Sequence, residues 1–142
     1  MKYTNIPNTN IKVSKICLGT MTFGQQNTEA EAHEQLNHAI EKGINFIDTA
    51  EMYAIPASAD TQGETERIIG TWLSKKGNRD KVILASKISG PSRGFNHIRE
   101  NLDFSKASLD DALHKSLKRL QTDYLDLYQL HWPERDVNIF GV

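Results

Sequence analysis

Four side chains with complementary proton chemistry follow apolar runs of this sequence: Asp48, Tyr53, Lys87 and His131. A phenol is a weak acid at neutral pH, but a nearby ammonium group stabilises its phenolate form and makes it a better proton donor. Tyr53 could therefore protonate a substrate oxygen with the help of Lys87. Asp48 would hold Lys87 charged and oriented, and His131 would hydrogen-bond the same substrate oxygen.

This set of side chains suits the reduction of a carbonyl group, in which the oxygen gains a proton and the carbon gains a hydride. No protein side chain supplies hydride, so the interpretation requires a nicotinamide cofactor. The sequence lacks a G-x-G-x-x-G motif, and the Gly19-x4-Gly24 spacing is followed by a polar loop and not immediately by a helix. A dinucleotide would therefore bind without the Rossmann fingerprint.

The elements that must position these residues alternate along the chain. Residues 2–14 predict a small hairpin, and apolar runs starting near residues 16, 44, 81 and 125 predict buried strands. Helical periodicity between the strands predicts three helices, with Thr28 and Glu31 capping the first and Ser108 capping the third. Such alternation makes a parallel sheet, whose strands present their carboxyl ends along one edge. Both an open doubly wound sheet and half of a (β/α)8 barrel fit this order.

Other polar residues have simpler structural explanations. Cys17 lies inside the first apolar run and is expected to be a small core residue. The long segment after the third strand holds Arg93, His97 and Arg99, which are expected to be solvated, with a lid over the ligand as the alternative. Each of the four candidate residues, taken singly, could also be a turn or loop residue. The prediction of a site therefore rests on their joint placement at one edge of the sheet.

Composition excludes several classes of protein. A length of 142 residues predicts a single domain, and 17 Lys and Arg against 18 Asp and Glu leave no positive field for nucleic acid or an anionic membrane. The single cysteine excludes a disulfide framework and a multi-cysteine metal site, and no metal is expected. No apolar run approaches the ~20 residues that span a bilayer. A cytoplasmic protein that acts on a small molecule is expected.

The segments around the candidate residues resemble the aldo-keto reductase superfamily. Residues 43–53, followed by 63–70, are similar to the first signature of the family, and residues 116–120 with 123–133 are similar to a later one. The amino terminus and residues 131–135 resemble the bacterial Tas-like branch. Together these motifs are much more specific than any single short pattern.

The resemblance implies the amino-terminal half of a (β/α)8 TIM barrel with an N-terminal β-hairpin at its bottom. It also implies NADPH-dependent reduction of aldehydes or ketones to alcohols, with a catalytic tetrad in which Tyr53 is the general acid: Asp48, Tyr53, Lys87 and His131. Thr20 and Met21, in the turn after the first strand, together with Asp48, are implied to adjoin the cofactor.

Family members are longer, and the groups that grip the rest of their cofactor follow the fourth strand. Residues 1–142 are therefore expected to be one aldo-keto reductase domain truncated after strand 4 of the barrel. Three interpretations stay open: a catalytic half that needs the missing half, an inert half-barrel fragment, or a binding or regulatory module. Four strands cannot close a barrel, so the exposed strand edges predict self-association or marginal stability.

Overall fold

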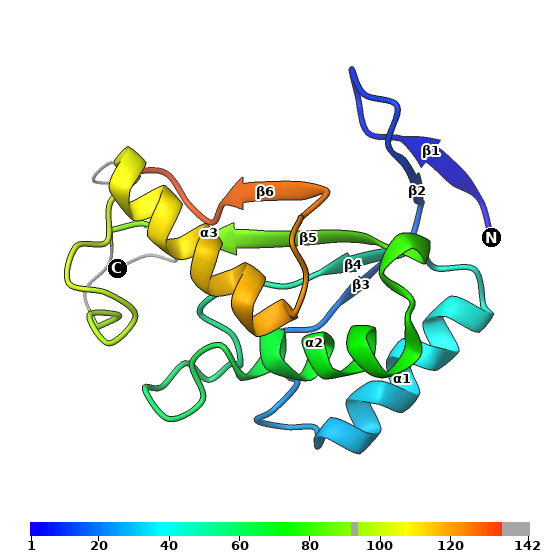
Figure 1. The fold of residues 1–142 in the computed structure, drawn as a ribbon, viewed down its shortest axis with the longest axis horizontal. Helices are drawn as coiled ribbons and strands as arrows, with labels where there is room; N and C mark the ends of the chain where they lie inside the picture. Colours follow the sequence, from blue (N-terminus) through cyan, green and yellow to red (C-terminus); the bar gives the residue numbers. More distant parts are fainter. Residues whose placement is uncertain (92–93, 135–142) are drawn as a thin grey trace, which may run out of the picture.

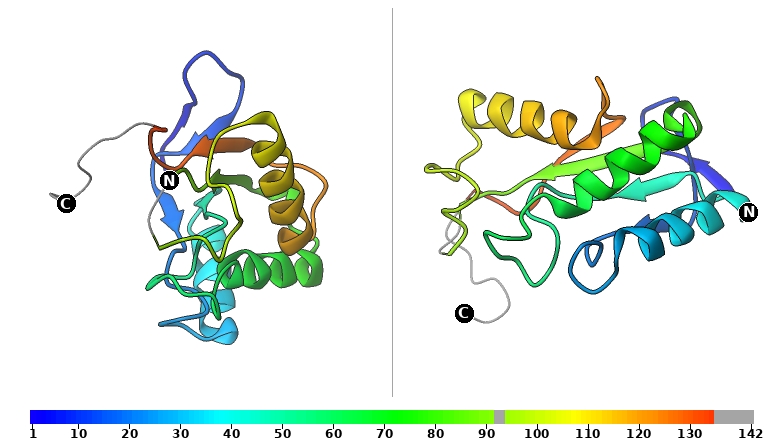
Figure 2. Two further views of the ribbon diagram at one scale, coloured as in Figure 1. Left: turned by 90° about the vertical axis from the view of Figure 1, so that its left-hand side faces the viewer. Right: turned by 60° about the horizontal axis from the view of Figure 1, so that its bottom comes forward.

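A computed structural model describes residues 1–91 and 94–134 of the chain. It consists of a four-stranded parallel sheet with three helices along one side, and a separate two-stranded hairpin (Figures 1 and 2). The strands of the sheet are β3 (Cys17–Gly19), β4 (Phe46–Asp48), β5 (Ile83–Ile88) and β6 (Leu127–Leu130). The helices are α1 (Glu29–Glu41), α2 (Glu64–Lys76) and α3 (Lys106–Leu120).

The order of the strands decides between the two architectures that the sequence left open. The sheet runs β3-β4-β5-β6 in chain order, every neighbouring pair is parallel, and one helix follows each of the first three strands. A doubly wound sheet reverses its strand order and has helices on both faces. Sequential strands with helices outside are instead the geometry of a (β/α)8 barrel, and the chain forms part of one.

The helix starts follow local capping chemistry. The capping box predicted for α1 is confirmed, because Thr28 Oγ1 accepts from the backbone N of Glu31 and Glu31 Oε2 accepts from the N of Thr28 at 2.8 Å. The cap predicted for α3 is wrong. Ser105 is the N-cap, its hydroxyl accepting from the N of Ser108 at 3.3 Å, and Ser108 lies inside the first helical turn. Two serines three residues apart offer the same signal, and the upstream one forms the cap.

The strands are shorter than the apolar runs suggest. β5 begins at Ile83 after a 3-10 turn, η1 (Arg79–Lys81), and β6 begins at Leu127 rather than near Tyr124. The reason is Arg79, whose Nη2 donates to the Tyr124 carbonyl at 3.0 Å and to Asp126 Oδ2 at 2.8 Å. These contacts fix the segment before β6 in an irregular conformation.

The hydrophobic core lies between the sheet and the helices. Its largest buried side chain is Trp72 of α2, which packs with Leu36 of α1, Ile47 of β4 and Leu84 of β5. The Trp72 indole N–H donates to Asn37 Oδ1 at 2.9 Å, so its polar atom is satisfied. This layer joins all three helices to the central strands and so fixes where each strand ends.

The opposite face of the sheet is more open. Cys17 lies on this face, so the prediction that it is a core residue is wrong. Leu18 of β3 packs against the core, so the alternation of the strand turns Cys17 and Gly19 to the other face, where both are exposed. Within residues 1–91 and 94–134, no second layer of structure covers this face. An apolar run predicts a strand but does not show that both of its faces are covered.

The hairpin of β1 (Tyr3–Asn5) and β2 (Lys12–Ser14) lies at the amino-terminal end of the sheet (Figure 1). Asn45, just before β4, holds it there. The Asn45 side chain accepts from the N of Ser14 at 2.7 Å and donates to the carbonyl of Lys12 at 3.0 Å. The hairpin thus covers the end of the sheet that lies away from the candidate residues.

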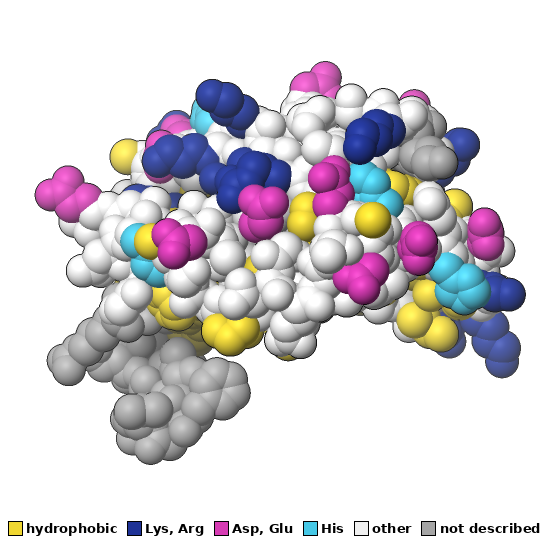
Figure 3. Space-filling model, turned by 90° about the horizontal axis from the view of Figure 1, so that it is seen from below, with side chains coloured by type: hydrophobic (Ala, Val, Ile, Leu, Met, Phe, Trp, Pro, Cys, Tyr) yellow, Lys and Arg dark blue, Asp and Glu magenta, His cyan; other side chains and the backbone are white. Residues whose placement is uncertain are grey.

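The face formed by α1 and α2 carries interspersed acidic and basic side chains, with small hydrophobic areas between them (Figure 3). This mixed pattern is typical of an amphipathic helix layer whose polar side is solvated. In the part of the chain that the structure describes, no helix combines the length and apolar character needed to cross a membrane.

Candidate functional site

An ion pair at the carboxyl ends of the strands is the centre of the candidate site. Lys87 Nζ lies 2.6 Å from Asp48 Oδ2 and also donates to the Thr49 carbonyl at 2.8 Å. Gln129 Nε2 donates to the second carboxylate oxygen of Asp48 at 3.1 Å. The register pairs Asp48 with Ala85 and Lys87 with Gln129, so the three polar side chains share one face of three neighbouring strands. Asp48 is thereby held by side chains of the next two strands in the sheet, β5 and β6.

Tyr53 lies beside this ion pair, in the loop between β4 and α2. The Lys87 ammonium is 5.0 Å from the centroid of the Tyr53 ring. The His131 ring meets the same phenol edge-on, with centroids 5.6 Å apart and the two planes at 77°. The structure therefore brings together all four residues that the sequence singled out: a phenol flanked by an ammonium and an imidazole, with a carboxylate behind the ammonium.

His131 is set in place by the strand that precedes it. Its backbone N donates to the Ile88 carbonyl at 3.0 Å, and its Nδ1 is buried without a hydrogen-bond partner among the described residues. Burial above all, and then the positive charge of Lys87, lowers the pKa of His131 to about 4. At neutral pH the imidazole is uncharged, with one N–H donor and one acceptor nitrogen.

We expect this histidine to make the fold less stable as the pH falls from about 6.5 towards 4. The unfolded chain protonates the imidazole near its ordinary pKa of 6.5, whereas the folded chain does so only near about 4. The unfolded state therefore binds the extra proton between these values, and the free energy of unfolding falls as the pH falls through that window.

Urea unfolding of the wild type and of His131→Asn, each at pH 7 and pH 5, measures this effect. The wild type should lose more stability between the two pH values than the variant does. An NMR titration of His131 in the folded protein gives an independent check, and a midpoint at or above 6.5 would contradict the assignment.

The turn after β3 supplies the residues expected beside a cofactor. Thr20 is fully buried and its hydroxyl donates to the Asp48 carbonyl at 2.9 Å, so that hydroxyl is already occupied. The Met21 side chain is 49% exposed. Gly19 stands opposite Asp48 in the register, and a methyl group added there would meet nothing within 4 Å. The space at Gly19, beside Asp48, is thus open.

Two residues near the site were missed at the sequence level. Gln129 could have been found, because it lies two residues before His131 and strand alternation puts both on one face. Glu51, between Asp48 and Tyr53, is 1% exposed and forms a two-pronged ion pair with Arg99. No periodicity or spacing marks it as buried.

The expectation that Arg99 is solvated is wrong, since its side chain is only 8% exposed and is paired with Glu51. His97 is exposed, with its ring 6.1 Å from that of Phe95, and Arg93 lies outside the described residues. Among the described residues, no group of three or more His, Cys, Asp or Glu side chains is arranged to hold a metal ion.

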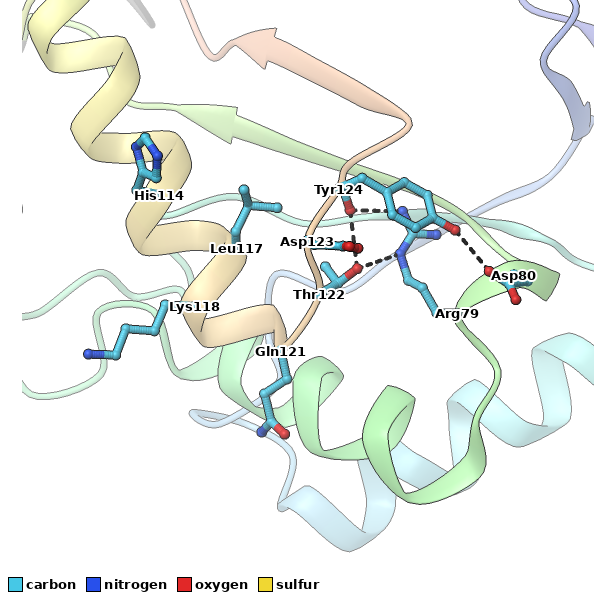
Figure 4. Close-up of a pocket in the computed structure, with 9 residues that line it drawn as sticks. All are labelled: Arg79, Asp80, His114, Leu117, Lys118, Gln121, Thr122, Asp123 and Tyr124. Carbon is cyan, nitrogen blue, oxygen red and sulfur yellow. Dashed lines mark hydrogen bonds between the residues drawn. The ribbon is translucent and has the colours of Figure 1, made fainter.

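A surface hollow elsewhere does not compete with this site. It lies at the amino-terminal end of the sheet, between the end of α3 and the segment that leads to β6 (Figure 4). Two of its charged groups are engaged with a neighbour: Arg79 stacks 3.7 Å from the centroid of the Tyr124 ring, and the Tyr124 hydroxyl donates to Asp80 Oδ1 at 3.1 Å. The hollow is the junction that fixes the start of β6.

The architecture and the position of the polar cluster define the class of protein. A sequential parallel sheet with helices outside is part of a (β/α)8 barrel, and the cluster lies at the carboxyl ends of the strands, where such barrels place their active sites. The model of the Aldo/keto reductase family matches residues 15–142. The chain belongs to this family.

Individual relatives agree with that assignment. The chain is 56% identical to Protein tas of Escherichia coli (strain K12), with 99% of this chain and 41% of the relative aligned. It is 38% identical to the aldo-keto reductase YhdN of Bacillus subtilis (strain 168), over 94% of this chain and 39% of the relative. Among solved structures, the holo form of aldo-keto reductase AKR11C1 from Bacillus halodurans superposes with a TM-score of 0.73 at 37% identity, covering 92% of this chain and 40% of that one. The chain thus spans about two fifths of the length of these relatives.

Proposed function

We propose that the protein reduces aldehydes or ketones to alcohols with NADPH, and that this chain supplies the proton-transfer half of the site. The observation that supports the proposal best is the cluster around Tyr53, whose ring lies 5.0 Å from the Lys87 ammonium and 5.6 Å from the His131 ring. The alternative functions are a binding or regulatory role for the same surface, or no activity at all.

The roles of the four side chains follow from their contacts. The Tyr53 hydroxyl would give its proton to the carbonyl oxygen as that oxygen becomes an alkoxide, and the Lys87 ammonium would stabilise the phenolate left behind. Asp48, at 2.6 Å from Lys87 Nζ, holds that ammonium in place. The uncharged His131 would donate a hydrogen bond to the same carbonyl oxygen and orient it.

NADPH, when bound, would supply the hydride that adds to the carbonyl carbon. Within this chain, Gly19, which has open space beside Asp48, and the exposed Met21 are the residues proposed to adjoin the nicotinamide. Thr20 would act indirectly, because its hydroxyl is bonded to the Asp48 carbonyl and fixes the turn.

The decisive experiment joins this chain to the remaining part of the E. coli relative, the segment that the alignment does not cover. Oxidation of NADPH on addition of a simple aldehyde supports the proposal, and the isolated 142-residue chain is assayed alongside. Trp132 reports binding, because its ring lies 4.9 Å from that of His131, whereas Trp72 is buried in the core. The reductase assignment fails if the joined protein folds, but NADPH neither quenches its Trp132 fluorescence nor is oxidised when the aldehyde is added.

We further propose that the isolated chain self-associates through the exposed edges of its sheet. β3 and β6 are the two edge strands of the sheet. Ile16, just before β3, is 56% exposed, and Leu130, the last residue of β6, is 57% exposed. Unpaired strand edges with apolar neighbours favour pairing with another chain. Sedimentation should show dimers or larger species that Leu130→Lys reduces, whereas a tight wild-type monomer with cooperative unfolding would argue against this proposal.

A further inference from the structure

Glu51 is a buried charge at the centre of the loops that carry the candidate site. Its carboxylate is 1% exposed, and both of its oxygens accept from Arg99, with Nη1 to Oε2 at 2.8 Å and Nη2 to Oε1 at 2.7 Å. Oε1 also accepts from the backbone N of Ser89 at 2.6 Å. We call this ion pair the Glu51–Arg99 clamp.

The clamp links the backbone that carries Tyr53 to the backbone that carries Lys87. Glu51 stands two residues before Tyr53, and its own N donates to the Lys87 carbonyl at 3.2 Å. Its carboxylate then holds Ser89, two residues after Lys87. The segment from Lys87 to Ser89 is thus tied to Glu51 at both ends.

Arg99 adds a third segment to this junction. It comes from the long connection between β5 and α3, and besides Glu51 its Nη2 donates to the Ser89 carbonyl at 3.0 Å. A two-pronged guanidinium–carboxylate contact fixes both distance and orientation. The connections that follow β4 and β5 therefore meet on one pair of buried charges.

We propose that the Glu51–Arg99 clamp is a positioning device that holds the Tyr53 phenol within reach of the Lys87 ammonium. The expected effect of the clamp on kcat rests on the proposed reductase function, but its expected effect on the position of Tyr53 relative to Lys87 does not. Neither Glu51 nor Arg99 needs to touch substrate, since the clamp acts through the backbone on either side of Tyr53 and Lys87.

A second ion pair in the chain provides a matched control. Glu66 of α2 is fully buried, and its Oε2 accepts from Arg119 Nε at 2.7 Å. This pair joins α2 to α3, and Glu66 Oε1 also accepts from the Ser86 hydroxyl of β5 at 2.6 Å. Among the described residues it forms no hydrogen bond to the loop that carries Tyr53 or to residues 87–89. Both pairs are buried Glu–Arg contacts, so a purely stabilising role would make the two respond alike.

The experiment compares two double variants, Glu51→Gln/Arg99→Gln and Glu66→Gln/Arg119→Gln. Neutralising both partners avoids leaving an unpaired buried charge, which would unfold the chain more readily. In the chain with 13C-labelled tyrosine, Lys87→Met is introduced into each background, and the resulting change in the Tyr53 Cζ chemical shift is measured.

We expect Lys87→Met to shift the Tyr53 signal in the wild type and in the Glu66/Arg119 variant, and to shift it less than half as much in the Glu51/Arg99 variant. An equal change in all three backgrounds would overturn the proposal. If only the Glu51/Arg99 variant gives the spectrum of an unfolded chain, Arg99→Lys takes its place, because lysine keeps the charge pair with Glu51 but loses the two-pronged contact. The same two outcomes then apply to Arg99→Lys.

Kinetics in the protein joined to the E. coli segment give the second measurement. The Glu51/Arg99 variant should lose about 10- to 100-fold in kcat with an unchanged KM for NADPH, because a misplacement of about 1 Å can cost 10²-fold. The control variant should lose thermal stability but keep its kcat. If the wild type is inactive but Lys87→Met still shifts the Tyr53 signal less in the Glu51/Arg99 variant, the reductase proposal fails and the positioning role stands. Equal losses of kcat in both double variants would refute the positioning role.

Discussion

Replacing Tyr53 with Phe should abolish most carbonyl reduction while leaving the affinity for NADPH nearly unchanged. The change removes one hydroxyl group, the proposed proton donor, and keeps the ring that packs edge-on against His131. General acid catalysis contributes about 10² to 10⁴-fold to a rate, so kcat should fall by a factor of that order. The measurement is NADPH oxidation with a simple aldehyde, and cofactor binding is followed by quenching of Trp132 fluorescence.

The chain offers a matched control for this substitution. Tyr128 lies on β6 with its hydroxyl buried and without a hydrogen-bond partner among the described residues. Strand alternation places it on the opposite face from Gln129 and the candidate site. Tyr128→Phe makes the same chemical change and should leave kcat within about two-fold. Near-normal turnover by Tyr53→Phe would remove Tyr53 from the role of proton donor.

The parts of the fold that could be predicted are those that short-range physics fixes. Thr28 and Glu31 form the expected capping box because three residues of spacing bring their groups together regardless of the rest of the chain. The convergence of Asp48, Lys87 and His131 could be predicted because parallel strands present their carboxyl ends along one edge. Both inferences need only local pattern and one topological rule.

The choice of Ser108 over Ser105 was a local error, but the errors at the site arise where a residue's environment depends on distant segments. Cys17 and Arg99 were both misplaced, one expected buried and the other solvated. The exposure of Cys17 depends on whether anything covers the inner face of the sheet, and the burial of Arg99 depends on Glu51, which is 48 residues away. No local sequence pattern indicates the exposure of Cys17 or the burial of Arg99. The Glu51–Arg99 clamp could therefore be found only from the structure.

The second large effect concerns the buried pair of Glu66 and Arg119, which joins α2 to α3. We expect Arg119→Met alone to lower the free energy of unfolding by about 3–5 kcal/mol, because removing one partner of a buried ion pair leaves an uncompensated charge. Total stabilities are about 5–15 kcal/mol, so this variant should be close to unfolding at room temperature. Urea titration of the purified protein measures the loss.

A second variant tests whether the loss of stability comes from the unpaired Glu66 carboxylate or from lost packing. The double variant Glu66→Gln/Arg119→Met should be more stable than Arg119→Met, because an amide oxygen can still accept the Ser86 hydroxyl, which lies 2.6 Å from Glu66 Oε1. Arg67→Met is the surface control: its ion pair with Glu64 is 2.7 Å long, but the two side chains are 45% and 38% exposed, and such pairs contribute about 0–1 kcal/mol. Equal losses in the single and double variants would show that the methylene packing of Arg119, rather than the unpaired charge of Glu66, sets the stability of the α2–α3 contact.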